Sequence, residues 1–107
     1  MVKLLASHHA RERARQRIGW HRRTLDRMLE RVFYDGLGPE DCSRRLGEFV
    51  AATVNTAAGL SRIYGEHLFL FTRDHADEVV LLTVYPLPSE LKSAAHRARR
   101  QQNALAA

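Results

Sequence analysis

The sequence predicts an α+β fold in which N-terminal helices pack on a small antiparallel β-meander of three to four strands. Three observations predict this class. Apolar residues recur at helical spacing in residues 7–59, the pattern changes to short β-branched and aromatic segments in residues 60–85, and turn residues separate the segments. A chain of 107 residues suits one domain with one hydrophobic core. We assign residues 1–88 to this single domain and residues 89–107 to a basic C-terminal tail.

The first helix is expected between Ser7, a suitable N-cap, and Gly19, a suitable C-terminal stop. Small apolar residues at a spacing of four form its expected buried stripe: Ala10, Ala14 and Ile18. His9, Arg13 and Arg17 form a second row beside that stripe, at i, i+4 and i+8. We therefore expect this row to emerge where the helix meets the core.

Two further helices are predicted from apolar spacing. The second presents five apolar residues to the core: Leu25, Met28, Leu29, Val32 and Phe33. Residues 35–39 end it, and Pro39 starts the third helix, with Glu40 and Asp41 near the positive end of its dipole. The third helix repeats the spacing and ends at residues 57–59; its apolar positions are Leu46, Phe49, Val50, Thr53 and Val54.

The predicted strands are residues 60–64, 67–72 and 78–85, and residues 2–5 could add a fourth. Gly65-Glu66 suits a two-residue hairpin turn, and residues 73–77 form a polar loop. In the last strand, alternation places Val79, Leu81, Thr83 and Tyr85 on one face and Val80, Leu82 and Val84 on the other. The tail from Ser89 shows no core-facing stripe, so we expect it to be helical or mobile.

Positive charge is concentrated at the two ends of the chain, whose net charge is +5. Residues 7–31 contain eight arginines and three acids, residues 32–88 four arginines and eight acids, and residues 89–107 four cations and one acid. The pattern favours a polyanionic partner, RNA or DNA before a membrane, because the basic segments lack a bulky apolar face. The alternative is an arginine-rich surface that contacts only water.

Two segments together carry a resemblance: His9-Ala10 with Arg13 and Arg17-Ile18-Gly19, and Leu82-Thr83-Val84-Tyr85. The chain resembles the RelE-like branch of the barnase–EndoU–colicin–RelE ribonuclease superfamily, and more closely its uncharacterised toxin-like and phage-borne proteins that begin with a histidine–arginine motif. The resemblance implies a RelE-like α+β domain over residues 1–88. It also implies metal-independent RNA cleavage, in which a ribose 2′-hydroxyl attacks the adjacent phosphate. One departure is that Lys3 and Lys92 match no motif position, although RelE-type toxins often use lysines.

The candidate catalytic residues are His9, Arg13, Arg17, Thr83 and Tyr85. Transesterification needs a base, an acid and positive donors for the phosphorane. His9 could act as acid or base because an imidazole titrates near neutral pH, and the two arginines could hold the phosphate. Thr83 and Tyr85 would add hydroxyl contacts if their face of the sheet points to the first helix. Each of these residues also has an ordinary structural interpretation.

Five further residues are candidates for nucleic-acid binding: Arg11, Arg15, Arg22, Arg23 and His67. We predict no cofactor and no metal site, because the histidines form no His-Glu-x-x-His pattern and there is no thiolate cluster. The single cysteine, Cys42, cannot form an internal disulfide; we interpret it as a small helix residue that fits a reducing cytoplasm.

Two functions are therefore retained. The first is a small basic RNA-binding protein that is an endoribonuclease, as a toxin or phage effector in the cytoplasm of a bacterial host cell. The second is a non-catalytic module that binds nucleic acid, or blocks a host protein, through the same basic face. The expected partners are transfer RNA or ribosome-bound messenger RNA, with an acidic antitoxin or a host protein as alternatives, and no membrane.

Overall fold

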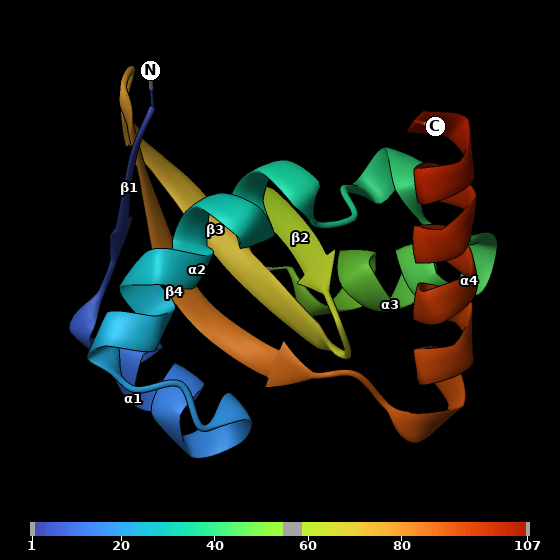
Figure 1. Cartoon of the computed structure of the whole chain (residues 1–107), viewed down its shortest axis with the longest axis horizontal. Helices are drawn as coiled ribbons and strands as arrows, with labels where there is room; N and C mark the ends of the chain where they lie inside the picture. Colours follow the sequence, from blue (N-terminus) through green and yellow to red (C-terminus); the bar gives the residue numbers. More distant parts are fainter. Residues whose placement is uncertain (1, 55–58, 107) are drawn as a thin grey trace.

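The computed structural model describes residues 2–54 and 59–106 (Figure 1). Its elements, in chain order, are β1 (Lys3–Ala6), α1 (His8–Ile18), α2 (Arg22–Asp35), a 3-10 turn η1 (Pro39–Asp41), α3 (Arg44–Thr53), β2 (Leu60–Tyr64), β3 (His67–His75), β4 (Glu78–Pro86) and α4 (Ser89–Ala106). The predicted α+β class is confirmed.

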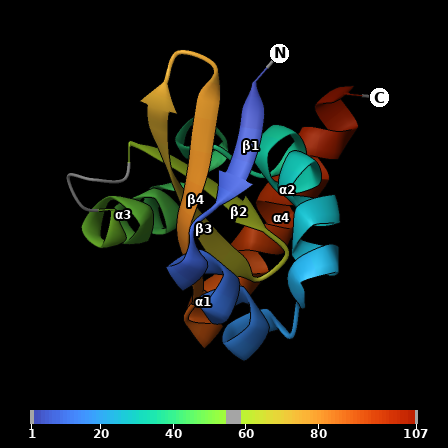
Figure 2. The same ribbon diagram turned by 90° about the vertical axis from the view of Figure 1, so that its left-hand side faces the viewer.

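The four strands form one sheet in the order β1-β4-β3-β2. Strands β2, β3 and β4 are the predicted antiparallel meander, joined first by a tight turn at Gly65, whose φ is +61°. The expected fourth strand is present, but β1 runs parallel to β4, from Lys3 opposite Glu78 to Ala6 opposite Leu81. The sheet is therefore mixed, and Figure 2 shows β1 beside β4 with α1 following its end.

Helices cover both faces of the sheet (Figure 1). On one face, α1 and α2 pack on Phe69, Phe71 and Val84. Of the predicted stripe of α1, Ala10 and Ala14 are fully buried and Ile18 is partly buried. On the other face, α3 and α4 pack on Leu68 and Leu70. The alternation of β3 thus supplies both cores, as a strand covered on both faces requires.

The predicted face assignment in β4 is wrong beyond Leu82. Phe71 pairs with Leu81, but Leu70 pairs with Thr83, so Leu82 is an extra residue in β4. A bulge of this kind reverses the faces of all later residues. Val84 therefore joins the α1 and α2 core, while Tyr85 packs against the opposite one.

The third helix starts later than predicted. Pro39 begins only the short turn η1, in which the Asp41 carboxylate accepts a hydrogen bond from the Gly38 amide at 3.0 Å. The backbone of Cys42 is extended, with ψ of 144°, so Cys42 lies between η1 and α3 and is not a helix residue as expected. The predicted stop at residues 57–59 falls mostly outside the described residues, and α3 ends at Thr53.

The C-terminal segment is a long helix that belongs to the core, so the expectation of a tail without a core-facing stripe is wrong. Its buried stripe consists of Leu91, Ala94, Ala95 and Ala98. Three of these four residues are alanines, whose small side chains give a weak apolar signal although their spacing is helical. The predicted polar loop at 73–77 is also shorter than expected, because β3 continues to His75.

Candidate functional site

The row of His9, Arg13 and Arg17 on α1, here called the α1 row, lies beside the buried stripe, but its three members differ in what they contact. His9 is exposed and Arg13 half-buried, with Arg13 Nη1 donating to Gln16 Oε1 at 2.8 Å. Arg17 Nη1 donates to the carbonyl oxygen of Val84 at 2.5 Å, and its guanidinium lies 5.1 Å from the centre of the Tyr85 ring. Of these three side chains, Arg17 is therefore the one with a recorded contact to the last strand in the described residues.

Arg17 lies there because β1 is shorter than β4. The ladder between them ends at Ala6 and Leu81, which leaves later carbonyls of β4 at an open edge. The Ser7 hydroxyl donates to the carbonyl of Leu82 at 3.4 Å, and the Arg17 guanidinium donates to the carbonyl of Val84. An unpaired strand edge invites pairing with another chain, so both side chains have a structural role in covering it. The guanidinium has five N–H donors, so donors remain for a ligand.

Thr83 and Tyr85 do not act as a pair beside α1. Thr83 is 9% exposed and follows the bulge onto the face that α3 and α4 cover. Tyr85 is half-buried, and its ring reaches the helix only through the guanidinium of Arg17. Of the two predicted hydroxyl donors, only Tyr85 therefore lies beside the α1 row.

His67, predicted to bind nucleic acid, lies at the end of α1. Its Nε2 is 3.3 Å from the carbonyl oxygen of Arg17. Burial lowers the pKa of His67 from the ordinary value of 6.5, so the imidazole is neutral at pH 7. A carbonyl oxygen only accepts hydrogen bonds, so Nε2 carries the proton and Nδ1 is the basic nitrogen.

The residue before it, Glu66, connects the β2–β3 turn to α4. Its carboxylate lies 2.9 Å from His96 Nε2 and 3.5 Å from Lys92 Nζ. The hydrogen bond from His96 is the main cause that lowers the pKa of Glu66, and the charge of Lys92 adds to it. Lys92, which matched no position of the sequence motif, is thus placed beside Glu66, and its charge also acts on His67.

A second basic surface runs along α2 and was missed in the sequence. Arg23, Arg27 and Arg31 occur at i, i+4 and i+8, and all three side chains are exposed; we call them the α2 row. The signal that would have found them is the same spacing that identified the α1 row. Of these three, only Arg23 was a predicted contact.

Within the described residues, Arg11 forms an ion pair with a carboxylate, whereas several other arginines of α1 and α2 do not. Arg11 Nη1 lies 2.9 Å from Asp26 Oδ1, so this predicted nucleic-acid contact instead links α1 to α2. Arg15, Arg22 and the three arginines of the α2 row form no ion pair within residues 2–54 and 59–106. These five exposed arginines are therefore available to an external anion.

Two other arginines close the C-terminal end of α2. Arg62 Nε donates to the carbonyl of Phe33 at 2.8 Å, and Arg99 Nη1 donates to that of Asp35. The last carbonyls of a helix lack partners within the helix and carry partial negative charge, which cations offset. Arg62 and Arg99 are therefore structural.

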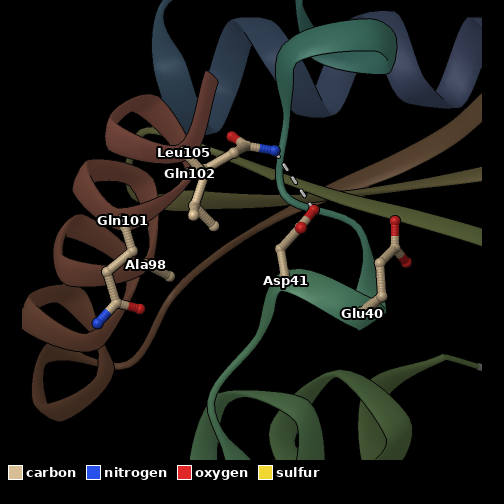
Figure 3. Close-up of a pocket in the computed structure, with 6 residues that line it drawn as sticks. All are labelled: Glu40, Asp41, Ala98, Gln101, Gln102 and Leu105. Carbon is tan, nitrogen blue, oxygen red and sulfur yellow. Dashed lines mark hydrogen bonds between the residues drawn. The ribbon is translucent and has the colours of Figure 1, made fainter. Parts of the chain in front are cut away.

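A pocket of about 530 Å³ lies between η1 and α4 (Figure 3). Its lining residues are Glu40, Asp41, Ala98, Gln101, Gln102 and Leu105. Gln102 Nε2 donates to Asp41 Oδ2 at 3.4 Å across it. Carboxylates at its wall disfavour a phosphate, so this pocket does not extend the basic site.

Cys42 is adjacent to this pocket and is a poor nucleophile. Burial raises the pKa of its thiol to about 11, with further contributions from Asp41 and Glu40. The thiolate is the reactive form, so the thiol is inert at neutral pH.

Residues 2–54 and 59–106 contain neither a candidate metal-ion cluster nor a helix that could span a membrane. No group of three or more His, Cys, Asp or Glu side chains there is arranged to hold a metal ion. No helix there has the length and apolar character needed to cross a membrane. Comparison with protein-family models, curated proteins and solved structures finds no match to this chain.

Proposed function

We propose that this protein binds RNA through the α2 row, with Arg15 and Arg22 extending the surface. The observation that carries the proposal is a row of three exposed arginines that pair with no carboxylate in residues 2–54 and 59–106. Guanidinium groups bind phosphate oxygens with two parallel hydrogen bonds, and regularly spaced cations match a polymer of phosphates.

The α2 row is unfavourable for the helix by itself. Like charges at i, i+4 destabilise a helix by roughly 0.2–0.5 kcal/mol per pair, and the row contains two such pairs. Glu30 and Asp26 lie on the same helix, yet Asp26 pairs with Arg11 from α1. An anionic ligand along the row would remove this repulsion, which supports a binding role over a merely solvated surface.

The test compares two triple variants with equal charge. Arg23, Arg27 and Arg31 are changed to Gln in one, and the exposed Arg45, Arg97 and Arg100 on α3 and α4 are changed to Gln in the other. The first variant should bind RNA roughly tenfold or more weakly, measured by fluorescence anisotropy. Its plot of log affinity against log salt should flatten by about two, at about 0.7 per lost phosphate contact. Equal losses in both variants would show a general charge effect and overturn the proposed site.

RNA cleavage at the end of β4 is the second candidate function, favoured by one observation. A neutral histidine, His67, an arginine with unused donors, Arg17, and a tyrosine, Tyr85, meet there. His67 Nδ1 could take the proton from a 2′-hydroxyl as that oxygen attacks the phosphate held by Arg17, and the Tyr85 hydroxyl could give a proton to the 5′-oxygen as its bond to phosphorus breaks. His9 is exposed near the N-terminal end of α1 and is a second candidate acid or base.

The same RNA samples test cleavage. They are incubated with EDTA, and the ends are analysed for cyclic phosphate. Cleavage lost in His67→Gln and in Tyr85→Phe, with binding retained, would support this site. Loss only in His9→Ala would move the catalytic group to the α1 row. Binding without cleavage in the unchanged protein would leave the non-catalytic module as the function.

A further inference from the structure

Tyr34 is an exposed aromatic residue at the end of the α2 row. Its exposed fraction is 58%, and with Leu105 it is one of two large apolar side chains exposed in the described part of the chain. Residues 27, 31 and 34 fall on one helix face at i, i+4 and i+7. Side chains of a helix lean towards its N-terminus, so the ring of Tyr34 leans towards the turn that carries Arg31.

The ring of Tyr34 is held in place by a neighbouring aromatic ring. It packs edge-on against Phe33, with ring centres 5.2 Å apart. Phe33 is buried, packs edge-on against Phe71 at 5.4 Å, and lies under the guanidinium of Arg62 at 4.8 Å. The exposed ring therefore stands on an anchored one, which reduces the conformational entropy that a ligand would have to remove.

We propose that Tyr34 stacks on an unpaired base of a single-stranded RNA segment whose phosphates lie along the α2 row. This inference rests on the proposed function and specifies its ligand. From Arg23 to Tyr34 the helix rises about 16 Å, the length of about five stacked nucleotides. Every base has an aromatic face, so stacking on tyrosine strengthens binding without reading sequence.

The local charge assigns the base, and not a phosphate, to this position. The positive row stops at Arg31, and the exposed carboxylates of Glu30 and Asp35 flank Tyr34. A phosphate above the ring would meet these carboxylates, whereas a base is uncharged. In a duplex the bases are stacked and paired inside the helix, so only a single strand offers a free face.

The test uses Tyr34→Ala, Tyr34→Phe and, as a control at another exposed apolar residue, Leu105→Ala. Binding is measured with a single-stranded RNA of about ten nucleotides, the same sequence as a duplex, and the single strand with abasic sites. Tyr34→Ala should weaken single-strand binding about tenfold and leave duplex binding and the salt dependence unchanged. Tyr34→Phe keeps the ring and should bind like the unchanged protein, as should Leu105→Ala.

The abasic strand separates stacking from other effects. With no base to stack, it should bind equally to the unchanged protein and to Tyr34→Ala. Equal weakening of all three RNAs by Tyr34→Ala, or no weakening of the single strand, would overturn the stacking role. If the α2 triple variant still loses binding in that case, the proposed function stands and only its single-strand specificity falls.

Discussion

The side chain of Arg17 has a structural role and also keeps N–H donors for a ligand. One nitrogen holds the Val84 carbonyl at the open edge of β4, and the guanidinium plane covers Tyr85. Arg62 and Arg99 donate to backbone carbonyls at the end of α2 in the same way, whereas the α2 row makes no such contact in the described part of the chain. A function assigned to an arginine of this chain therefore depends on its existing partners more than on the local density of charge.

Ser7 offers a prediction at the same scale, because it makes two contacts with one hydroxyl. Its oxygen accepts from the Ala10 amide at 3.1 Å as the N-cap of α1 and donates to Leu82. Ser7→Ala should lower the free energy of unfolding by about 1–2 kcal/mol. Ser43, the N-cap of α3, makes no side-chain capping bond, so Ser43→Ala should change it by less than about 0.5 kcal/mol. Urea denaturation measures both, and equal effects would contradict the assigned role of Ser7.

At the scale of elements, a helix with bulky apolar residues at helical spacing could be predicted from the sequence. The packing of α4 and the bulge in β4 could not. The α2 helix was predicted from five apolar residues, of which Leu25, Leu29, Val32 and Phe33 are buried and Met28 is half-buried. The α4 helix was predicted as an unpacked tail because alanine contributes little to an apolar pattern. The bulge at Leu82 depends on pairing with β3, which no local pattern in β4 encodes.

The candidate site was predictable to the same limited extent. Helical spacing correctly placed Arg17 beside the core, and β-strand position placed Tyr85 near the end of β4. Their contact depends on β1 stopping at Ala6, which is a property of the whole sheet. Spacing alone would have found the α2 row, but exposure and free charge could be judged only from the fold.

Packing of α4 can be tested with two leucines of the same helix. Leu91 is 6% exposed and Leu105 is 88% exposed. Leu91→Ala leaves a cavity in the core that α3 and α4 share, so it should lower the free energy of unfolding by about 2–4 kcal/mol. Leu105→Ala should leave it nearly unchanged. A similar small effect of both substitutions in urea denaturation would mean that α4 does not pack as described.

At the scale of the molecule, the β2–β3 turn joins the two helical layers. His67 contacts the end of α1 on one face, and Glu66 contacts Lys92 and His96 of α4. Both residues have a lowered pKa in the folded state. Proton uptake at this turn therefore acts on both attachments, at His67 for the α1 layer and at Glu66 for the α4 layer.

The pH dependence of stability follows from these two shifts. The unfolded chain binds a proton at His67 more readily than the folded chain, so stability should fall as the pH decreases below 6.5, the ordinary histidine value. The lowered pKa of Glu66 should add a second loss below 4.5. His67→Gln should remove the first loss and keep the second, and Glu66→Gln should do the reverse. Urea denaturation between about pH 7.5 and 3.5 measures both steps. The free energy of unfolding of His67→Gln could instead run parallel to that of the unchanged protein between pH 6.5 and pH 4.5. In that case protonation of His67 is not coupled to folding, and the assignment of His67 as a neutral base beside Arg17 is wrong.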